Sequence, residues 1–302
     1  MNKLPLISVI MNCFNGARFL NEAIQSVYDQ NYSNFEIIFW DNNSSDDSVK
    51  IAKDFGDKIK IFVSPVTTTL GSARNSAIKK AKGKYICFLD TDDMFVNNKF
   101  FKQVKLMSES KLMMSYGSAR FFRGNKTIWI RKAKNKSGYL LNNLLRTYEI
   151  VMNTVMLDRK LINNVEFSFN PDLKYSPDYN LFMNIALKYE IGVLNEVIGN
   201  YRVHEDSWTR KLFHIVANEQ RFTLNQIAQK DKNITIKYAK NYFYSQKKTY
   251  YYEAIAHISD NNYPKARGFL KKIIFDDFLY FSLYFLLCLP INNQTILKIL
   301  KR

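Results

Sequence analysis

The stretch Tyr85-Ile-Cys-Phe-Leu-Asp-Thr-Asp-Asp93 joins five apolar residues directly to three carboxylates. A short apolar run that ends in polar residues is typical of a buried strand. Three acids within four residues repel one another, so the turn that follows needs a counter-cation or full hydration. An Asp-x-Asp at this position suits a divalent cation, which can in turn bind a diphosphate. The alternative is an acidic turn that caps the next helix.

The residues around this stretch alternate between two patterns over positions 1–110. Short apolar runs predict strands at 7–11, 35–40, 59–64 and 85–89. Helices are predicted between them, at 17–30, 46–55 and 71–82. Strand and helix in regular alternation predict an α/β fold with a mostly parallel sheet flanked by helices. Ligands of such sheets bind beyond the carboxyl ends of the strands, which here carry Asn12, Asn15, residues 41–45 and residues 90–93.

The pattern loosens after about Lys111. We expect a hairpin with strands at 112–122 and 127–131, a helix at 178–188 and a strand at 192–203. Beyond about Thr209 the chain is predicted to be helical, which places a domain boundary near Trp208. The predicted organisation is one domain over 1–208, with halves at 1–110 and 111–208, followed by a helical C-terminal extension at 209–302.

The chain is strongly basic. Its 302 residues include 44 Lys and Arg against 27 Asp and Glu, a net charge of +17, and residues 207–302 hold 16 of the bases but only 6 of the acids. Such a balance suits an anionic membrane surface, a phosphorylated substrate or nucleic acid. Nucleic acid is the weakest of these interpretations, because the acids gather at the strand ends where a polyanion would have to dock.

Cysteine usage and hydropathy bear on location. Cys13, Cys87 and Cys288 lie in apolar segments without paired spacing, which predicts buried, reduced thiols in a cytoplasmic protein. No leader-like apolar stretch precedes the first strand. The longest apolar run, Phe278 to Pro290, is about thirteen residues, short of the roughly 20 that span a bilayer as a helix.

Several stretches, taken in order over residues 5–208, are informative together. They are Ile7-Ser-Val-Ile-Met-Asn-Cys-Phe-Asn-Gly16, Phe35-Glu-Ile-Ile-Phe-Trp-Asp-Asn-Asn-Ser-Ser-Asp46, Gly71-Ser-Ala-Arg-Asn75, Ala81-Lys-Gly-Lys-Tyr-Ile-Cys-Phe-Leu-Asp-Thr-Asp-Asp93, Tyr175-Ser-Pro-Asp-Tyr179 and Tyr201-Arg-Val-His204. In this order they resemble the inverting family 2 glycosyltransferases, which have the Rossmann-like GT-A fold. The resemblance implies a nucleotide-diphospho-sugar donor, most often UDP-linked, and a bound Mn²⁺ or Mg²⁺.

The resemblance also implies where the nucleotide binds. A uracil ring needs a flat partner for its face and an acceptor for its N–H. Phe14 would supply the face, Asn12 and Asn15 further polar contacts, and Asp41 or Asn42 the acceptor. Asn42 departs from the commoner second aspartate of the family. The alternatives are a core aromatic for Phe14 and a helix-capping turn after the second strand.

Further residues are expected at the diphosphate and the metal. The resemblance implies that Arg74 contacts phosphate oxygens, for which a guanidinium is well suited, although a surface charge is the alternative. Asp92 would bind the metal, with Asp90 nearer the ribose, and Asp93 and His204 would complete the metal site. Oxygen ligands suit both cations and a histidine favours Mn²⁺. A structural histidine at a strand end is the alternative for His204.

Asp178 is the expected general base. Inverting transfer requires one carboxylate to take the proton of the acceptor hydroxyl as that oxygen attacks the anomeric carbon. The chain has Pro177-Asp178 where the family usually has Glu-Asp, so the first acid is missing and the second is kept. Capping of the helix that starts here is an alternative that is compatible with catalysis.

Two basic regions remain. Residues 120–136 hold seven bases and no acid, which predicts either a solvated hairpin face or a cradle for an anionic acceptor or lipid phosphate. The bases are Arg120, Arg123, Lys126, Arg131, Lys132, Lys134 and Lys136. Near the C-terminus, Lys271-Lys272 and residues 298–302 flank the apolar run 275–289. Basic flanks around an apolar run suit a helix lying in an anionic membrane interface, and an ordinary helical cap is the alternative.

The sequence therefore predicts a metal-dependent, inverting glycosyltransferase of the hexosyltransferase type. It would move a sugar from a UDP-sugar to a hydroxyl of a cell-envelope or lipid-linked glycan, at the inner face of the cytoplasmic membrane and without a nucleic-acid partner. One alternative is a homologue that binds the donor without reacting, because of Asn42 and Pro177. A nucleotidyltransferase would show a Gly-rich basic loop after the first strand, and residues 12–18 have one Gly and one Arg. A basic nucleic-acid-binding protein is the remaining alternative.

Overall fold

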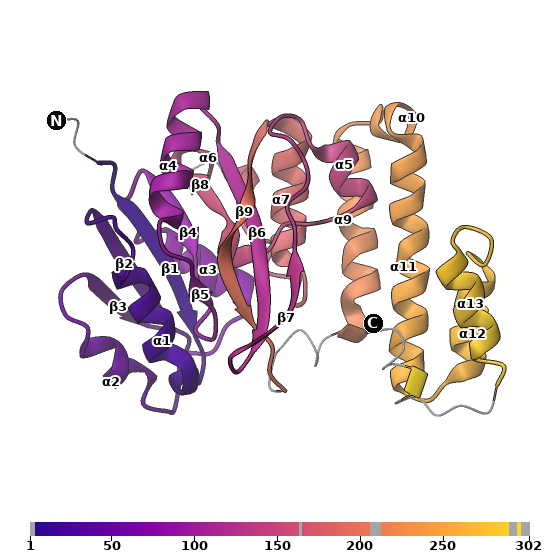
Figure 1. Ribbon diagram of the computed structural model, residues 1–302, viewed down its shortest axis with the longest axis horizontal. Coiled ribbons are helices and arrows are strands. Elements are labelled where there is room, and N and C mark those ends of the chain that lie inside the picture. The colour runs from indigo at the N-terminus through magenta and orange to yellow at the C-terminus, as the bar shows by residue number, and fades with distance from the viewer. Residues whose placement is uncertain (1–3, 163–164, 206–212, 290–294, 297–302) are drawn as a thin grey trace. The chain divides into compact units, whose positions relative to one another are not determined.

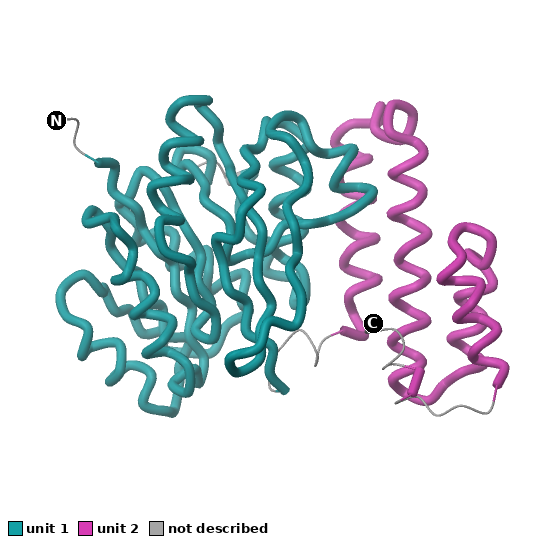
Figure 2. The backbone as a smooth tube through the Cα atoms, viewed as in Figure 1, with its two compact units in different colours: residues 1–205 teal, residues 206–302 magenta. Residues whose placement is uncertain are grey.

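The computed structural model describes residues 4–162, 165–205, 213–289 and 295–296 (Figure 1). Two compact units divide the chain, residues 1–205 and residues 206–302 (Figure 2). The predicted boundary residue Trp208 lies outside the described residues. The division still falls close to the predicted end of the first domain.

The first half of unit 1 is the predicted alternation of strands and helices. Its elements are β1 (Ile7–Cys13), α1 (Ala17–Tyr28), β2 (Phe35–Asp41), α2 (Ser48–Lys53), β3 (Ile59–Val63), α3 (Leu70–Ile78) and β4 (Tyr85–Phe88). β1 pairs in parallel with both β2 and β4, and β2 pairs in parallel with β3. α3 ends four residues before its predicted end, because the N–H groups of Lys82 and Gly83 donate to Glu36 and Ser8 instead of continuing the helix.

The second half of unit 1 is more mixed. Its helices and strands are β5 (Met94–Phe95), α4 (Lys99–Ser110), β6 (Met114–Arg123), β7 (Lys126–Arg131), α5 (Leu141–Arg146), β8 (Met156–Asp158), α6 (Arg159–Ile162), α7 (Pro177–Lys188) and β9 (Ile191–Arg202). The 3₁₀ turns η1 (Met152–Thr154) and η2 (Val165–Phe167) lie between them. The predicted hairpin is β6–β7, which turns at Gly124 with φ +53°. The sequence did not predict α4 or the short strands β5 and β8.

The strands described in unit 1 form one sheet. Its order is β3-β2-β1-β4-β8-β6-β9-β5, with β7 beside β6. β8 is antiparallel to β4 and β6, whereas β9 is parallel to β6 and antiparallel to β5. The predicted parallel sheet is therefore confirmed for the first half, while the second half mixes both orientations.

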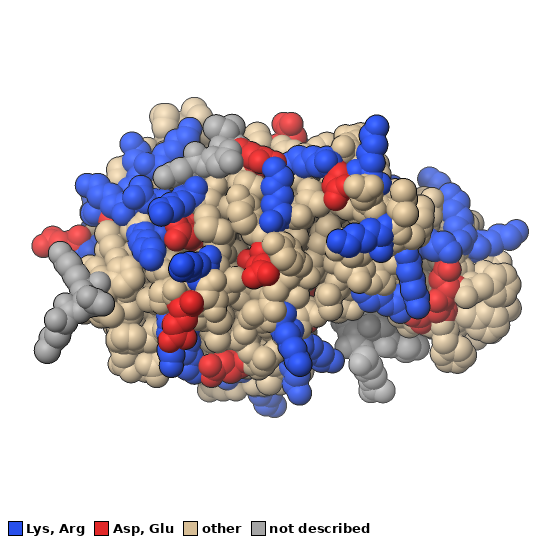
Figure 3. Space-filling view, turned by 90° about the horizontal axis from the view of Figure 1, so that it is seen from above, with Lys and Arg blue, Asp and Glu red and all other residues tan. Residues whose placement is uncertain are grey.

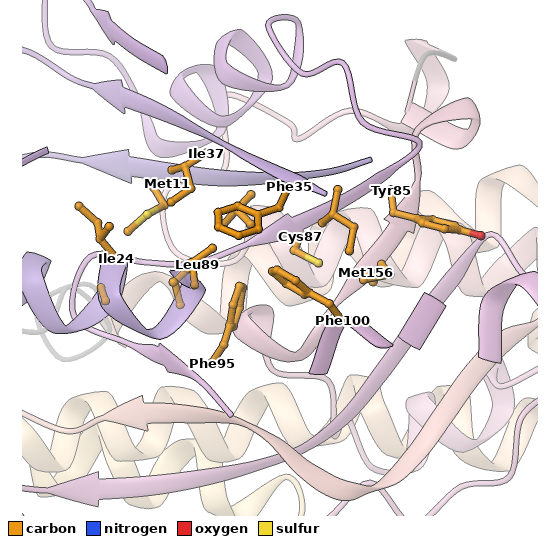
Figure 4. Packing of buried hydrophobic residues seen from close by; sticks show 14 of the residues in the cluster. Met11, Ile24, Phe35, Ile37, Tyr85, Cys87, Leu89, Phe95, Phe100 and Met156 are labelled. Atoms are coloured by element: carbon orange, nitrogen blue, oxygen red, sulfur yellow. The ribbon is translucent and has the colours of Figure 1, made fainter. Parts of the chain in front are cut away.

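The core of unit 1 lies between the sheet and its covering helices. Figure 4 shows Met11, Ile37 and Leu89 from the strand side close to Ile24 of α1, with Phe100 of α4 beside them. All five side chains are almost fully buried. Burying one such side chain stabilises the fold by about 1.5–3 kcal/mol, so the strand ends that carry the polar loops are held on a rigid base.

Unit 2 is helical, as predicted. It contains η3 (Phe213–Ile215), α9 (Val216–Lys230), α10 (Ile234–Lys237), α11 (Ala239–Ser259), α12 (Tyr263–Lys271) and α13 (Phe278–Leu286). Ala254, Ile258, Ala266, Leu270 and Leu283 form its own buried core. Among the described residues, no helix has the length and hydropathy that crossing a bilayer would require.

Two further predictions concern the surface. Cys13 and Cys87 are buried as expected, but Cys288 is exposed, so that part of the cysteine prediction is wrong. It lies two residues beyond the end of α13, where its thiol donates to the Tyr284 carbonyl instead of packing in the core. Figure 3 shows Lys and Arg side chains scattered over the face seen from above, with fewer Asp and Glu among them. On this face the excess of basic side chains is thus spread over the surface and does not form a single patch.

Candidate active site

The loops that follow β1, β2 and β4 contact one another. The Asn15 side-chain oxygen accepts a 2.8 Å hydrogen bond from the Ser45 N–H, and the Asn42 N–H donates to the Cys13 carbonyl at 2.8 Å. A Cβ on Gly16 would lie 2.5 Å from Oγ1 of Thr91, so only glycine permits this approach to the acidic loop. The predicted convergence of polar strand ends is therefore present. Asn15 holds two of these loops together.

Asp41 and Asn42 stand side by side at the end of β2 but differ in their partners. Both side-chain ends of Asn42 bond to Thr68, the amide donating to its carbonyl at 2.8 Å and the oxygen accepting from its N–H at 3.0 Å. Asp41 accepts from the Ser44 N–H at 3.0 Å through Oδ2. Its buried Oδ1 has no hydrogen-bond partner among the described residues. Asp41, not Asn42, therefore has an acceptor available for a ligand.

Two more groups face the same loops. Phe14 is exposed, which excludes the alternative of a core aromatic. The buried Nδ2 of Asn12 finds no acceptor in the part of the chain that the structure describes. Buried amide hydrogens are costly when unpaired, so both residues have contacts to offer to a bound molecule.

Arg74 is buried rather than a surface charge. Its Nη2 donates to Oδ1 of Asp90 at 2.9 Å, and its guanidinium lies 5.4 Å from the ring centre of Phe169. Asn75 fixes Phe169 through two backbone hydrogen bonds, one donated to the carbonyl at 2.8 Å and one accepted from the N–H at 3.0 Å. Arg74 is thus held in one position beside the acidic loop.

Asp92 and His204 meet although 112 residues separate them. Nε2 of His204 lies 2.8 Å from Oδ2 of Asp92, and the imidazole packs 5.4 Å from the Phe19 ring. Burial and the nearby charge of Asp90 raise the pKa of Asp92, while His204 opposes that shift. Two neighbouring ligands of one octahedral cation lie about 3 Å apart, given metal–oxygen distances near 2.1 Å. The pair therefore fits a shared divalent cation, whose charge would also stabilise the buried carboxylate.

Asp93 differs from its neighbour. Its two oxygens accept hydrogen bonds from the Arg202 N–H and from the Asn153 amide, each at 2.9 Å. Burial and the charges of Asp92 and Asp90 raise its pKa well above the ordinary range. These contacts give Asp93 an anchoring role and do not support the expected metal ligation. Within the described ranges, no group of three or more His, Cys, Asp or Glu side chains is arranged to hold a metal.

Asp178 lies in the first turn of α7 and is half-buried. Burial raises its pKa, the positive charge of Arg74 opposes the rise, and Asp90 adds to it. The charges of Arg74 and Asp90 both act on Asp178, so the three groups form one electrostatic cluster. The acidic loop, Arg74, His204 and the predicted base Asp178 thus act on one another at the carboxyl ends of the strands.

Tyr148 is a member of this cluster that sequence reasoning missed. Its ring meets Tyr179 edge-on at 4.8 Å. Burial and the negative charge of Asp178 raise the pKa of its hydroxyl well above the usual range. That buried hydroxyl makes no hydrogen bond within the described chain. Nothing in the loosely patterned segment around Tyr148 distinguished it from a core tyrosine.

Arg202 was also missed, although it lies inside the Tyr201–His204 motif. Its Nε donates to the Asp92 carbonyl and its Nη2 to Glu22, both at 2.8 Å. Its guanidinium packs 4.3 Å from the Phe19 ring centre. Arg202 therefore fixes the backbone of the acidic loop from β9. The motif pointed to this strand end, but only the histidine had a recognisable chemical role.

Comparison with known proteins identifies the family. Residues 8–161 match the model of Glycosyl transferase family 2. The chain belongs to glycosyltransferase family 2. It is 31% identical over 211 residues to WfgD of Escherichia coli, named as a UDP-Glc:alpha-D-GlcNAc-diphosphoundecaprenol beta-1,3-glucosyltransferase. That match covers 69% of this chain and 81% of WfgD. The prediction of a glycosyltransferase is confirmed.

Solved structures show the same fold. TarS (residues 1–349) of S. aureus, solved with UDP-GlcNAc, superposes with a TM-score of 0.64 at 18% identity and covers 89% of this chain and 80% of that one. The mannosyltransferase PcManGT of Pyrobaculum calidifontis, solved with GDP-Man and Mn²⁺, gives 0.62 at 15% identity and covers 90% and 76%. The predicted GT-A fold with a helical C-terminal region is confirmed.

Proposed function

We propose that this glycosyltransferase is metal-dependent and inverting, and that it uses a UDP-sugar. One observation carries the proposal: Asp92 and His204 lie 2.8 Å apart beside the Arg74–Asp90 ion pair, with Asp178 within electrostatic reach of that pair. Displacement of a nucleoside diphosphate requires three groups. They are a site for a divalent metal ion, a positively charged side chain that binds phosphate, and a carboxylate base.

The donor nucleotide would bind across the loops after β1 and β2. Oδ1 of Asp41 would accept the N–H of the uracil ring, and Phe14 would cover the ring face. Asn12 would donate to a carbonyl of the base through its buried amide. WfgD is named for a UDP-Glc donor and TarS was solved with UDP-GlcNAc, and both of these donors carry uracil. With Asp41 as the acceptor, Asn42 no longer weakens the expectation of a uridine donor.

Asp92 and His204 would hold Mn²⁺ or Mg²⁺. A bound divalent cation supplies positive charge against the diphosphate as it leaves. Arg74 adds a second positive charge, held in place by Asp90 and by the Phe169 ring. PcManGT, which has the same fold, was solved with GDP-Man and Mn²⁺, which supports a divalent cation in the proposal.

Asp178 would act as the general base. Its carboxylate takes the proton of the acceptor hydroxyl while that oxygen attacks the anomeric carbon from the face opposite the diphosphate, which inverts the configuration. A base is most effective when its pKa lies near the working pH, and burial shifts the pKa of Asp178 in that direction. The absent acid at Pro177 leaves this role intact.

The acceptor would be a glycan carried on a lipid diphosphate at the inner face of the cytoplasmic membrane. The name of WfgD specifies such an acceptor. In unit 2, the segment around α13 exposes Phe275 by 92% and Phe278 by 83%, with Phe281, Phe285 and Leu289 also exposed. Exposed aromatics of this kind, next to Lys271 and Lys272, suit insertion into the headgroup region of an anionic membrane. The residues 298–302 that were expected to contribute lie outside the described residues.

The test is release of UDP from UDP-glucose and UDP-N-acetylglucosamine, with N-acetylglucosamine diphosphate on a short alkyl chain as acceptor, with and without Mn²⁺. We expect acceptor-dependent release that chelation abolishes, and a product of inverted anomeric configuration. Activity that survives both chelation and Asp92→Ala would contradict the metal role. Donor binding without any release would favour the alternative of a degenerate homologue.

A further inference from the structure

Strands β7, β6 and β9 carry three aromatic side chains on one face of the sheet, and the strands run side by side in Figure 1. The rings of Trp129 and Phe121 stack with centres 4.4 Å apart and planes 16° apart. Tyr201 of β9 packs 4.7 Å from Phe121. Trp129 is 44% exposed although it is a large aromatic. We call Trp129, Phe121 and Tyr201 the aromatic platform.

Arg131 lies on the same face as the platform. It pairs with Ala119 in the register that pairs Trp129 with Phe121, and its guanidinium lies 5.2 Å from the Phe121 ring centre. No carboxylate of the described chain forms an ion pair with Arg131. An exposed arginine without an acidic partner next to an aromatic surface is suited to a phosphate ligand.

The platform is continuous with the catalytic cluster. Val151 packs against Phe121 from the segment that also carries Tyr148. Tyr148 in turn contacts Tyr179, the neighbour of Asp178. The charges of Arg131 and Asp178 shift the pKa of the Tyr148 hydroxyl in opposite directions, so both groups lie near it. The row from platform to base is therefore Phe121, the segment 148–151, Tyr179 and Asp178.

A buried network fixes the middle of this row. Glu149, next to Tyr148, accepts from the Tyr116 hydroxyl at 2.6 Å and from the Asn135 amide at 2.8 Å. It also accepts from the Lys134 N–H at 3.1 Å. A satisfied buried carboxylate ties the Tyr148 segment to the chain just after β7. The distance between the platform and the base is thereby set by the fold rather than by mobile side chains.

The geometry points to an acceptor subsite that takes a pyranose linked to a diphosphate. The apolar C–H face of the sugar stacks on Trp129, Arg131 pairs with the phosphates, and the Tyr148 hydroxyl donates to the sugar hydroxyl that Asp178 deprotonates. Aromatic side chains and a few placed polar groups are the usual lining of such sites. This assignment rests on the proposed function, since it gives Asp178 its substrate.

Strand β7 supplies its own matched control. Ile130 is also 44% exposed, but it lies on the opposite face, paired with Arg120. A membrane or a second chain that covered the edge strand would contact both faces. A sugar that stacks on the platform contacts Trp129 alone. Trp129→Ala and Ile130→Ala therefore distinguish the acceptor from those other occupants.

The experiment measures KM for N-acetylglucosamine diphosphate on a short alkyl chain, kcat, and the rise in Tm caused by UDP with Mn²⁺. Trp129→Ala should raise the acceptor KM about tenfold and leave the UDP-induced rise in Tm unchanged. Ile130→Ala should change neither. Arg131→Gln should raise KM for the diphosphate acceptor but not for the free sugar, and Tyr148→Phe should lower kcat more than it changes KM.

An unchanged acceptor KM in Trp129→Ala, or an equal loss in Ile130→Ala, would overturn the subsite. Calorimetric titration of the full chain with the same acceptor, without donor, tests the subsite even if no transfer is observed. If the wild type binds the acceptor but releases no UDP, and Trp129→Ala weakens that binding, the proposed function is contradicted and the subsite is supported. If every variant transfers with normal kinetics, the subsite is contradicted and the proposed function is supported.

Discussion

The two halves of unit 1 use polar side chains differently. In the first half, the described strand-end residues Asn12 and Asp41 keep buried polar atoms without a partner. In the second half, the Tyr148 hydroxyl and Nδ1 of His204 are also buried without a partner among the described residues, but the buried acid Glu149 next to Tyr148 is bonded within the protein. The first half presents its groups from a rigid parallel sheet, whereas the second half presents them from irregular segments that bonded side chains such as Glu149 hold in place. Donor binding therefore depends on topology, whereas acceptor placement depends on side-chain networks.

Asp178→Asn is the sharpest way to separate the halves. The amide cannot take a proton, so we expect transfer to fall by 10²–10⁴-fold. Donor binding belongs to the first half and should be retained, as measured by the rise in Tm with UDP and Mn²⁺. Normal transfer by this variant would place the base elsewhere.

Asp92→Ala removes a contact between the two halves. Asp92 belongs to the first half, and its partner His204 follows β9 in the second half. We expect transfer to fall by about 10²–10³-fold and the Mn²⁺-dependent part of the UDP-induced rise in Tm to disappear. Asp93→Asn is the matched control. It changes the neighbouring carboxylate, which we infer is an anchor and not a metal ligand, while keeping the size of the side chain. The metal response of that control should survive.

The same control makes a prediction of its own about stability. Asp93→Asn replaces one hydrogen-bond acceptor by an amide donor next to the Arg202 N–H or the Asn153 amide. Leaving a buried donor unpaired costs about 1–3 kcal/mol. We therefore expect the free energy of unfolding, measured in urea, to fall by that amount. Loss of Mn²⁺ binding at unchanged stability would instead restore Asp93 as a ligand.

Asp41→Asn tests the first half by itself. Whichever way the amide turns, one of the two acceptors becomes a donor, so either the Ser44 N–H or the base N–H loses its partner. We expect the Kd for UDP to rise about tenfold, in line with one lost hydrogen bond to a charged group. Titration calorimetry measures it. The acceptor KM should stay the same, and Asn42→Ala should affect stability through Thr68 more than it affects UDP affinity.

The smallest expected effect is on the pH profile. The base must be ionised to act, and burial raises the pKa of Asp178 above 3.8. Transfer should therefore rise with pH through a midpoint above that value, seen in kcat/KM for the acceptor. Arg74→Gln should move the midpoint higher, because the lost positive charge had lowered the pKa of Asp178. A midpoint that stays fixed in this variant would contradict the proximity of Arg74 and Asp178.

The sequence allowed the first half to be predicted because its information is local. Each strand of the first half is a short apolar run followed by polar residues, and the carboxyl ends of parallel strands meet at one edge of the sheet. That rule alone brought Asn12, Asp41 and Asp90 together. Local patterns also gave the β6–β7 hairpin and α7, since a turn glycine and an apolar helix face can be recognised without distant partners.

The rest depended on contacts between distant residues. Asp92 and Asp93 have similar sequence neighbours, and only Asn153 and Arg202, 60 and 109 residues away, distinguish their roles. Asn42 is not a candidate binding group, because Thr68 occupies both polar ends of its side chain. No local sequence pattern indicates this contact. Tyr148 became a candidate because α7 brings Asp178 to it. Short strands such as β8 carry too few residues for a periodicity to register.

The strand order also limits how this chain can be cut or recombined. β5 follows β4 directly in sequence but pairs at the far edge of the sheet, and β8 is inserted between β4 and β6. A hybrid enzyme that exchanges everything after residue 110 would leave β5 without its native β9 neighbour and β4 without β8. Exchange of acceptor specificity between relatives should therefore work by grafting the β6–β7 hairpin and the segment around Tyr148, and a protease nick near residue 111 should release no independently folded fragment.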